Sequence, residues 1–149
     1  MNIDLDNNKQ TTKSFMEILE ERLIEKFGKK IVEYGNEPCN YHRITDANGY
    51  ATYTGPCGDT MQVWIKVSQN VIEEIGFKTD GCGFTRAAGS VLTELAKGKQ
   101  IEEALQITPL QVDNDLGGLP EDHKHCALLA KDALGKAIEN YNDSKDKIR

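Results

Sequence analysis

The stretch Met61–Thr79, "MQVWIKVSQNVIEEIGFKT", carries the pattern that decides the fold. Its first half places apolar residues at every second position, as in a strand with one buried face: Met61, Val63, Ile65 and Val67. A short polar turn, Ser68–Asn70, then reverses the chain, and Val71–Thr79 is predicted to pair back antiparallel. Trp64 lies on the other face, where we expect a helix or a partner to cover it. A short strand at Tyr50–Tyr53 extends this meander to three strands.

Beyond the hairpin, apolar residues recur at helical spacing. One helix face is formed by Ala87, Ala88, Val91, Leu92 and Leu95, and Gly98 is placed to end that helix. Further helices are expected at Ile101–Leu105, after the N-cap pair Thr108-Pro109, and from about Asp122 to about Tyr141. Strands followed by helices predict an α+β fold, with a three-stranded antiparallel sheet and helices packed on it.

The segment before the strands predicts an N-terminal helical extension. Ser14 and Glu17 form a capping-box pattern, an amphipathic helix follows, and Gly28 is placed to end it. We therefore divide the chain into three parts: a tail and amphipathic helix at 1–33, the main domain at 34–141, and a charged tail at 142–149.

Length and composition limit the classes of protein to consider. The chain has 149 residues, of which 38% are hydrophobic and 28% charged, with a net charge of −6. One domain is expected, and the negative charge argues against nucleic acid or an anionic membrane as the main partner. The start lacks a secretory signal pattern, and no apolar run approaches the ~20 residues of a membrane span. A cytoplasmic location is expected, where clustered cysteines bind metals or act in catalysis more often than they form disulfides.

Three cysteines lie at predicted element ends. Cys57 precedes one strand and Cys82 follows its antiparallel neighbour, so these two ends should lie side by side. Cys126 joins them only through tertiary folding. Thiolates suit iron–sulfur clusters, zinc and Cu(I), and Asp59 adds a harder oxygen ligand, so the residues by themselves leave a zinc site and a cluster site open. Because the thiolate is both the ligand and the nucleophile, we expect the site to be partly exposed and to favour deprotonation.

Three short motifs occur in a distinctive order: Cys57-Gly58-Asp59, Gly81-Cys82-Gly83 and His125-Cys126. Together with the sequence between them, from about Tyr34 to Tyr141, these motifs resemble the signature of the U-type iron–sulfur cluster assembly scaffolds. These scaffolds are the IscU family and the N-terminal domain of NifU. The resemblance implies the same α+β fold and a scaffold rather than an enzyme.

The resemblance also implies roles for individual residues. Cys57, Cys82 and Cys126 match the cluster ligands and sulfur acceptors. Asp59 matches the aspartate that ligates the cluster and favours its release, and His125 an alternative ligand. The implied cargo is iron and a [2Fe-2S] cluster, with zinc in the cluster-free form. The implied partners are a cysteine desulfurase, recipient apo-proteins and a second copy in a homodimer.

The sequence departs from the family pattern in a few places. Leu119–His123 replaces a Leu-Pro-Pro-Val-Lys motif, which puts recognition by the dedicated Hsp70-type chaperone in doubt. Arg86 lies near the cysteines, where its charge is expected to stabilise thiolates, and Cys39 is an extra cysteine. The alternative function is a zinc-bound sulfur relay that accepts persulfide without carrying a cluster. Such relatives carry an insertion between Cys82 and Cys126, and none is obvious here.

Overall fold

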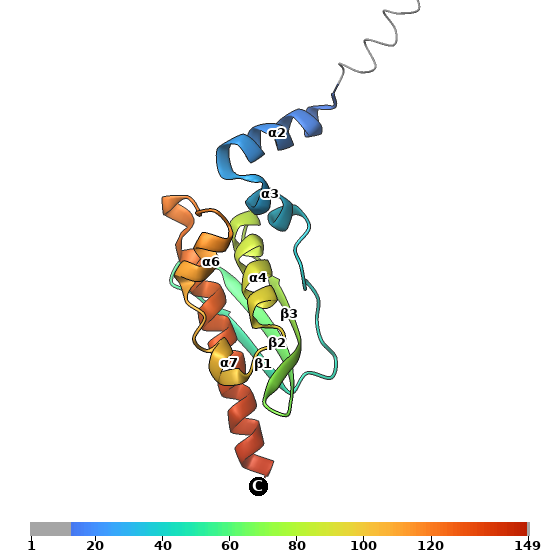
Figure 1. Ribbon diagram of the computed structural model, residues 1–149, viewed down its shortest axis with the longest axis vertical. Helices are drawn as coiled ribbons and strands as arrows, with labels where there is room; N and C mark the ends of the chain where they lie inside the picture. The colour runs from blue at the N-terminus through green and yellow to red at the C-terminus, as the bar shows by residue number, and fades with distance from the viewer. Residues whose placement is uncertain (1–12, 149) are drawn as a thin grey trace, which may run out of the picture.

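The sheet has the order β1-β2-β3, the antiparallel meander that the sequence predicts. A computed structural model describes residues 13–148 (Figure 1). The strands are β1 (Gly49–Thr54), β2 (Thr60–Ser68) and β3 (Val71–Thr79). Gln69 and Asn70 both have positive φ, 53° and 68°, which suits the two-residue hairpin turn between β2 and β3. Met61 pairs with Thr79, so the start of β2 lies beside the end of β3.

Helices α4 (Gly83–Ala96) and α7 (His125–Ile148) cover one face of the sheet (Figure 1). The core between them contains side chains that are fully buried: Met61, Val63, Ile65, Phe77, Ala87, Val91 and Ala133. The contact between α4 and β3 is very close at Gly89, because a Cβ there would lie 2.3 Å from Cε2 of Phe77. This packing fixes the N-terminal end of α4 at the same edge as the start of β2.

A loop covers part of the other face of the sheet. A Cβ on Gly76 would lie 2.1 Å from the carbonyl oxygen of His42, so the loop crosses β3 at this glycine. Trp64, the cross-strand partner of Gly76, is only 8% exposed, and its ring lies 5.4 Å from that of Tyr50 on β1. The predicted cover for Trp64 was a helix or a partner, which is wrong, because this loop and Tyr50 cover it.

Two helices precede the sheet, α2 (Phe15–Phe27) and α3 (Lys29–Asn36). The Ser14 side chain caps α2 by accepting the Glu17 N–H at 3.1 Å. Gly28, at φ 95°, ends α2 as predicted. No separate helix was predicted at Lys29–Asn36, where α3 lies. Ile31 on α3 is buried in the core, whereas α2 has no buried residue. The division of the chain at residue 33 stays a prediction, and the core contact of Ile31 lies before it.

The remaining helices connect α4 to α7. They are α5 (Ile101–Ala104), α6 (Pro109–Asp115), which Thr108 caps as predicted, and the 3-10 turn η1 (Glu121–His123). Because η1 takes up the residues before it, α7 begins at His125 rather than near Asp122, and it continues to Ile148. The charged stretch predicted as a tail from 142 is therefore the last part of a helix as far as 148. None of the described helices is long and apolar enough to cross a membrane.

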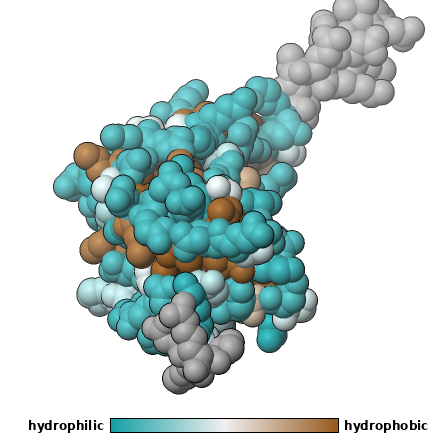
Figure 2. Space-filling model, turned by 60° about the horizontal axis from the view of Figure 1, so that its bottom comes forward, coloured by the Kyte–Doolittle hydropathy of each residue, from teal (hydrophilic) through white to brown (hydrophobic). Residues whose placement is uncertain are grey.

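The surface is mainly hydrophilic on the face that Figure 2 shows, with hydrophobic residues gathered in a band across it. Large hydrophobic side chains that are exposed occur on α2, on β1 and in or directly after the helices that follow α4: Phe15, Met16, Ile18, Leu19, Tyr50, Leu105, Leu110 and Leu128. They lie on elements whose opposite faces contact the body, except on α2, which has no buried residue.

Candidate metal centre

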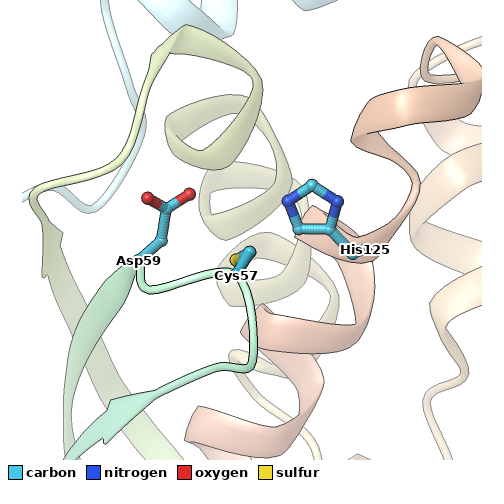
Figure 3. Close-up of side chains that lie close together, drawn as sticks. All are labelled: Cys57, Asp59 and His125. Atoms are coloured by element: carbon cyan, nitrogen blue, oxygen red, sulfur yellow. The ribbon is translucent and has the colours of Figure 1, made fainter.

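Cys57, Asp59 and His125 converge at one end of the sheet. One ligand atom from each lies within 4.8 Å of the others. Figure 3 shows the first two on the loop between β1 and β2, and the histidine facing them from the start of α7. Cys57 and His125 are exposed and Asp59 is half-buried. A sulfur, a carboxylate oxygen and an imidazole nitrogen at this spacing suit zinc or iron as ligands.

The loop holds Cys57 and Asp59 through a closed backbone turn. The Gly55 N–H donates to the Asp59 carbonyl and the Gly58 N–H donates to the Gly55 carbonyl, both at 3.0 Å. Gly58 has φ 94°, a conformation that a side chain would strain. The turn therefore needs a glycine between the two candidate ligands and presents both side chains at the same edge.

Cys82 reaches this edge from the neighbouring strand, as pairing geometry predicts. The Thr60 N–H donates to the Asp80 carboxylate at 2.8 Å, which ties the end of β3 to the start of β2. Cys82 is the N-cap residue of α4 and is exposed. Its Sγ lies 3.9 Å from the Thr85 hydroxyl. The structure thus places Cys82 beside the group without including it among the atoms within 4.8 Å, in the part of the chain that is described.

Cys126 lies on the inner side of the centre and is fully buried. Its Sγ lies 3.4 Å from Thr85 Oγ1 and 3.9 Å from His125 Nε2. Burial raises the pKa of the Cys126 thiol to about 11, the hydrogen bond with Thr85 lowers it, and the nearby charges of Cys82, Asp59 and Cys57 raise it. The site is partly exposed, as expected. The expectation that it favours deprotonation is wrong for Cys126, because this thiol lies out of water beside other acidic groups.

Thr85 is the residue of the centre that the sequence analysis missed. It is fully buried, and its hydroxyl lies 3.5 Å from Asp59 Oδ2, in addition to the contacts with Cys82 and Cys126. One signal was available in the sequence: a polar residue three positions after Cys82, in the first turn of a helix, points back toward the N-cap. The hydroxyl alone gives no reason to prefer a site role over packing.

Two basic residues near the motifs contact carbonyl or carboxylate oxygens rather than thiols. The Arg86 guanidinium donates through Nε to the Gly35 carbonyl at 2.7 Å and through Nη1 to the Gly81 carbonyl at 3.3 Å. Lys124 Nζ lies 3.2 Å from Asp113 and 3.1 Å from the Leu119 carbonyl. The expected thiolate stabilisation by Arg86 stays a prediction, because the contacts of this side chain tie α3 to the loop before Cys82.

Cys39 lies apart from the other three cysteines. Its backbone N–H donates to the Ser90 hydroxyl, in the middle of α4. Burial, followed by the charge of Glu94, raises the pKa of its thiol. The backbone contact places Cys39 beside the middle of α4 and not among the candidate ligands of the centre.

A series of aromatic rings runs from α2 to the centre. Phe27 packs edge-on against Phe84 at 5.0 Å, and Phe84 stacks on His123 at 4.2 Å. The His123 ring lies 6.2 Å from that of His125. These contacts join the last turn of α2 to the start of α4 and to the turn before α7.

The fold and the site define a small α+β protein with a cysteine-rich centre at one end of a three-stranded sheet. Residues 26–148 match the model of the NifU-like N terminal domain. The chain belongs to this family.

Named relatives and solved structures agree with that assignment. Over 127 residues the chain is 46% identical to the iron-sulfur cluster assembly scaffold protein IscU 1 of Archaeoglobus fulgidus, covering 83% of each protein. It is 41% identical over 118 residues to the scaffold protein IscU of Aquifex aeolicus, covering 77% of this chain and 75% of that protein. The crystal structure of a NifU-like N-terminal domain from Brucella abortus superimposes with a TM-score of 0.62 at 18% identity, covering 81% of this chain and 97% of that one. That last likeness shows the fold alone.

Proposed function

We propose that this protein is a scaffold on which an iron–sulfur cluster is assembled and from which it is passed to other proteins. The observation that carries the proposal is the convergence of Cys57, Asp59 and His125 within 4.8 Å, with Cys82 and Cys126 brought to the same place through Thr85. Relatives at 46% and 41% identity are named as such scaffolds. The role is one of holding and transferring cargo, without catalysis of its own.

The proposed ligands are Cys57, Asp59, Cys82 and Cys126, with His125 as the alternative ligand of a [2Fe-2S] cluster. Soft thiolates retain iron well, and a carboxylate is a harder and more labile ligand for a cluster that must leave. Cys57 and Cys82 are exposed, which suits loading from solution. Zinc fits the same donor set when no cluster is present.

Sulfur arrives, in this proposal, as the persulfide of a cysteine desulfurase. A thiolate of the scaffold attacks the outer sulfur, the S–S bond breaks, and the desulfurase leaves as its own thiolate while the scaffold cysteine becomes the persulfide. Accessible sulfurs suit this exchange, so Cys57 or Cys82 accepts first in the conformation described, and buried Cys126 does not. The recipients are apo iron–sulfur proteins, the compartment is the cytoplasm, and a homodimer is part of the same proposal.

Anaerobic reconstitution tests the function directly. The full chain is incubated with ferrous iron, cysteine and a catalytic amount of desulfurase, then examined by absorption and Mössbauer spectroscopy. A [2Fe-2S] spectrum that is lost in Cys57→Ser, Cys82→Ser and Cys126→Ser is expected, and Cys39→Ser is the matched control that should retain it. A colourless protein with tightly bound zinc that stimulates the desulfurase would replace the scaffold with the sulfur relay.

Asp59→Ala tests the proposed release ligand. Removing the carboxylate should preserve assembly and slow transfer of the cluster to an apo-ferredoxin, because the most labile ligand is gone. The transfer rate is followed by circular dichroism in the visible range. A variant that loses its cluster faster than the unmodified protein would contradict this role.

A further inference from the structure

The Thr85 hydroxyl occupies an unusual place inside the centre. Thr85 is fully buried, and its Oγ1 lies within hydrogen-bonding range of three candidate ligands: Asp59 at 3.5 Å, Cys126 at 3.4 Å and Cys82 at 3.9 Å. Each of these is a site side chain rather than a helix carbonyl, the usual partner of a buried threonine hydroxyl. The Thr85 hydroxyl therefore interacts with the candidate ligands of the centre.

The side chain of Thr85 is fixed in this position by its surroundings. A Cβ on Gly81 would lie 2.6 Å from Thr85 Oγ1 and 2.7 Å from Thr85 Cβ, so the chain before α4 passes directly over it. The residue also lies in the first turn of α4, whose core face is buried. The hydroxyl hydrogen can turn about the C–O bond, while the nearby backbone of Gly81 limits the space around the side chain.

One hydroxyl supplies one hydrogen and two acceptor lone pairs. An ionised Asp59 can only accept, and so can Cys126 when it is a thiolate ligand. The geometry fits a hydroxyl that donates to Asp59 Oδ2 and whose oxygen also contacts the Cys126 sulfur, so that one group bridges the two side chains. Hydrogen bonds of this kind to ligands orient them and tune the site.

We propose that Thr85 is a positioning residue of the centre, whose single hydroxyl bridges Cys126 and Asp59 and holds both side chains in place for binding the cargo. This inference rests on the proposed scaffold function, and it adds a residue that touches the ligands without being one. Thr85 thereby connects the buried ligand Cys126 with the half-buried ligand Asp59.

Two variants separate the hydroxyl from the packing. Thr85→Val has the same shape without the hydroxyl, and Thr85→Ser keeps the hydroxyl without the methyl group. The full chain, free of metal, is titrated anaerobically with Co²⁺, and the thiolate-to-cobalt charge-transfer band reports binding. Loss of a hydrogen bond to a metal ligand typically weakens metal binding ~10–100-fold, so Thr85→Val should bind Co²⁺ about tenfold more weakly, and Thr85→Ser within about twofold of the unmodified protein.

A residue that only packs would give the opposite ranking. Valine would then bind like threonine, and serine, which leaves a small cavity, would be the weaker variant. Thermal unfolding of the metal-free variants shows whether each is folded. If Thr85→Val does not fold, Thr85→Ala and Thr85→Ser supply the same comparison, because both remove the methyl group and only serine keeps the hydroxyl.

The link to Asp59 has its own test, a double-mutant cycle of Thr85→Val and Asp59→Ala on Co²⁺ affinity. The effect of Thr85→Val should shrink at least threefold when Asp59 is already alanine. Additive effects would overturn the link and leave Thr85 as a partner of Cys126 alone.

The reduction potential of the assembled cluster is the second readout. Hydrogen bonds to ligand sulfurs tune the potential, so Thr85→Val should lower it and Thr85→Ser should not. Equal Co²⁺ affinity and equal potential in Thr85→Val would overturn the inference and leave the scaffold function intact. A chain that binds Co²⁺ through thiolates but assembles no cluster would instead overturn the scaffold function, and the Co²⁺ comparison of the variants would still decide the role of Thr85.

Discussion

Helices α4 and α2 have nearly the same length, 14 and 13 residues, but they differ in how far their residues are buried. Nine residues of α4 are buried, and its first turn carries Cys82 and Thr85 of the centre. In α2 no residue is buried, and Phe15 and Met16 are 77% and 68% exposed. An isolated helix of this length is marginal in water. Packing therefore holds α4, whereas a cap and the contacts of its last turn hold α2.

The difference teaches what helical periodicity in a sequence means. Both segments have apolar residues at helical spacing, and both form helices. The spacing gives the direction in which apolar side chains point, and says nothing about whether another element covers them. The site lies on the helix that is covered, where a ligand can be held in place.

The largest effect is expected where the packing of α4 is tightest. Gly89→Ala places a Cβ 2.3 Å from the Phe77 ring, and overpacking of a core costs ~1–3 kcal/mol. We expect the free energy of unfolding to fall by about 2 kcal/mol, measured by urea denaturation.

The matched control is Gly135→Ala in α7, where nothing lies within 4 Å of the added Cβ. There the same change should raise the free energy of unfolding by about 0.5–1 kcal/mol through helix propensity. Equal effects at the two positions would mean that α4 does not pack on β3 as closely as described.

The pH dependence of stability is the next effect in size. The pKa of Cys126 is about 11 in the folded state against an ordinary 9.0, so the folded state keeps the proton to higher pH than the unfolded chain does. Retention of this proton adds to the free energy of unfolding; the contribution is complete below pH ~9 and is lost as the pH rises toward ~11. In metal-free, reduced protein the loss at pH 10 should be about 1 kcal/mol. Denaturation at pH 8 and pH 10 should show it in the unmodified chain and not in Cys126→Ser.

Arg86→Met tests how α3 is joined to α4. It removes the donors to the carbonyls of Gly35 and Gly81, both buried residues. Unsatisfied buried carbonyls cost ~1–3 kcal/mol, and partial replacement by water lowers the expected loss of unfolding free energy to about 1 kcal/mol. Arg86→Lys should recover only part of it, because lysine lacks the planar fork. Full recovery by lysine would show that charge alone matters there.

The smallest effect is expected in α2. Phe15→Ser removes an exposed side chain, and surface changes of this kind usually stay within ±0.5 kcal/mol. Val91→Ser, the counterpart on the buried face of α4, should cost about 1–3 kcal/mol because it buries a hydroxyl in the core. Both are measured by urea denaturation of the full chain. A loss above about 1 kcal/mol for Phe15→Ser would place α2 against the body or against a second copy.

The sequence predicted the sheet well because its signals are local. Alternation at Met61–Val67 and the polar turn at Ser68–Asn70 fix strand, turn and partner together. It did not predict α3, since Gly28 and the turn residues after Gly35 leave only a short pattern between them. It also placed the end of the last helix near Tyr141, because charge gave no apolar face to follow, although charged residues continue a helix readily.

The centre was predictable only in part. The structure brings Cys57, Asp59 and His125 together, and the pairing of β2 with β3 explains why Cys82 lies at the same edge, while the ligand roles stay predictions. The burial of Cys126 depends on how α7 packs against α4, and no local pattern reports that. Thr85 was missed for the same reason, since its hydroxyl matters only through residues that are distant in sequence.

The unequal exposure of the three cysteines also decides how the protein meets oxidants. Peroxide reacts with accessible thiolates, and Cys57 and Cys82 are exposed while Cys126 is fully buried. Damage therefore begins on the two outer sulfurs. The inner one stays a thiol, and condensation of this thiol with a sulfenic acid on an outer sulfur would release water and give a disulfide that thiol reductants can repair.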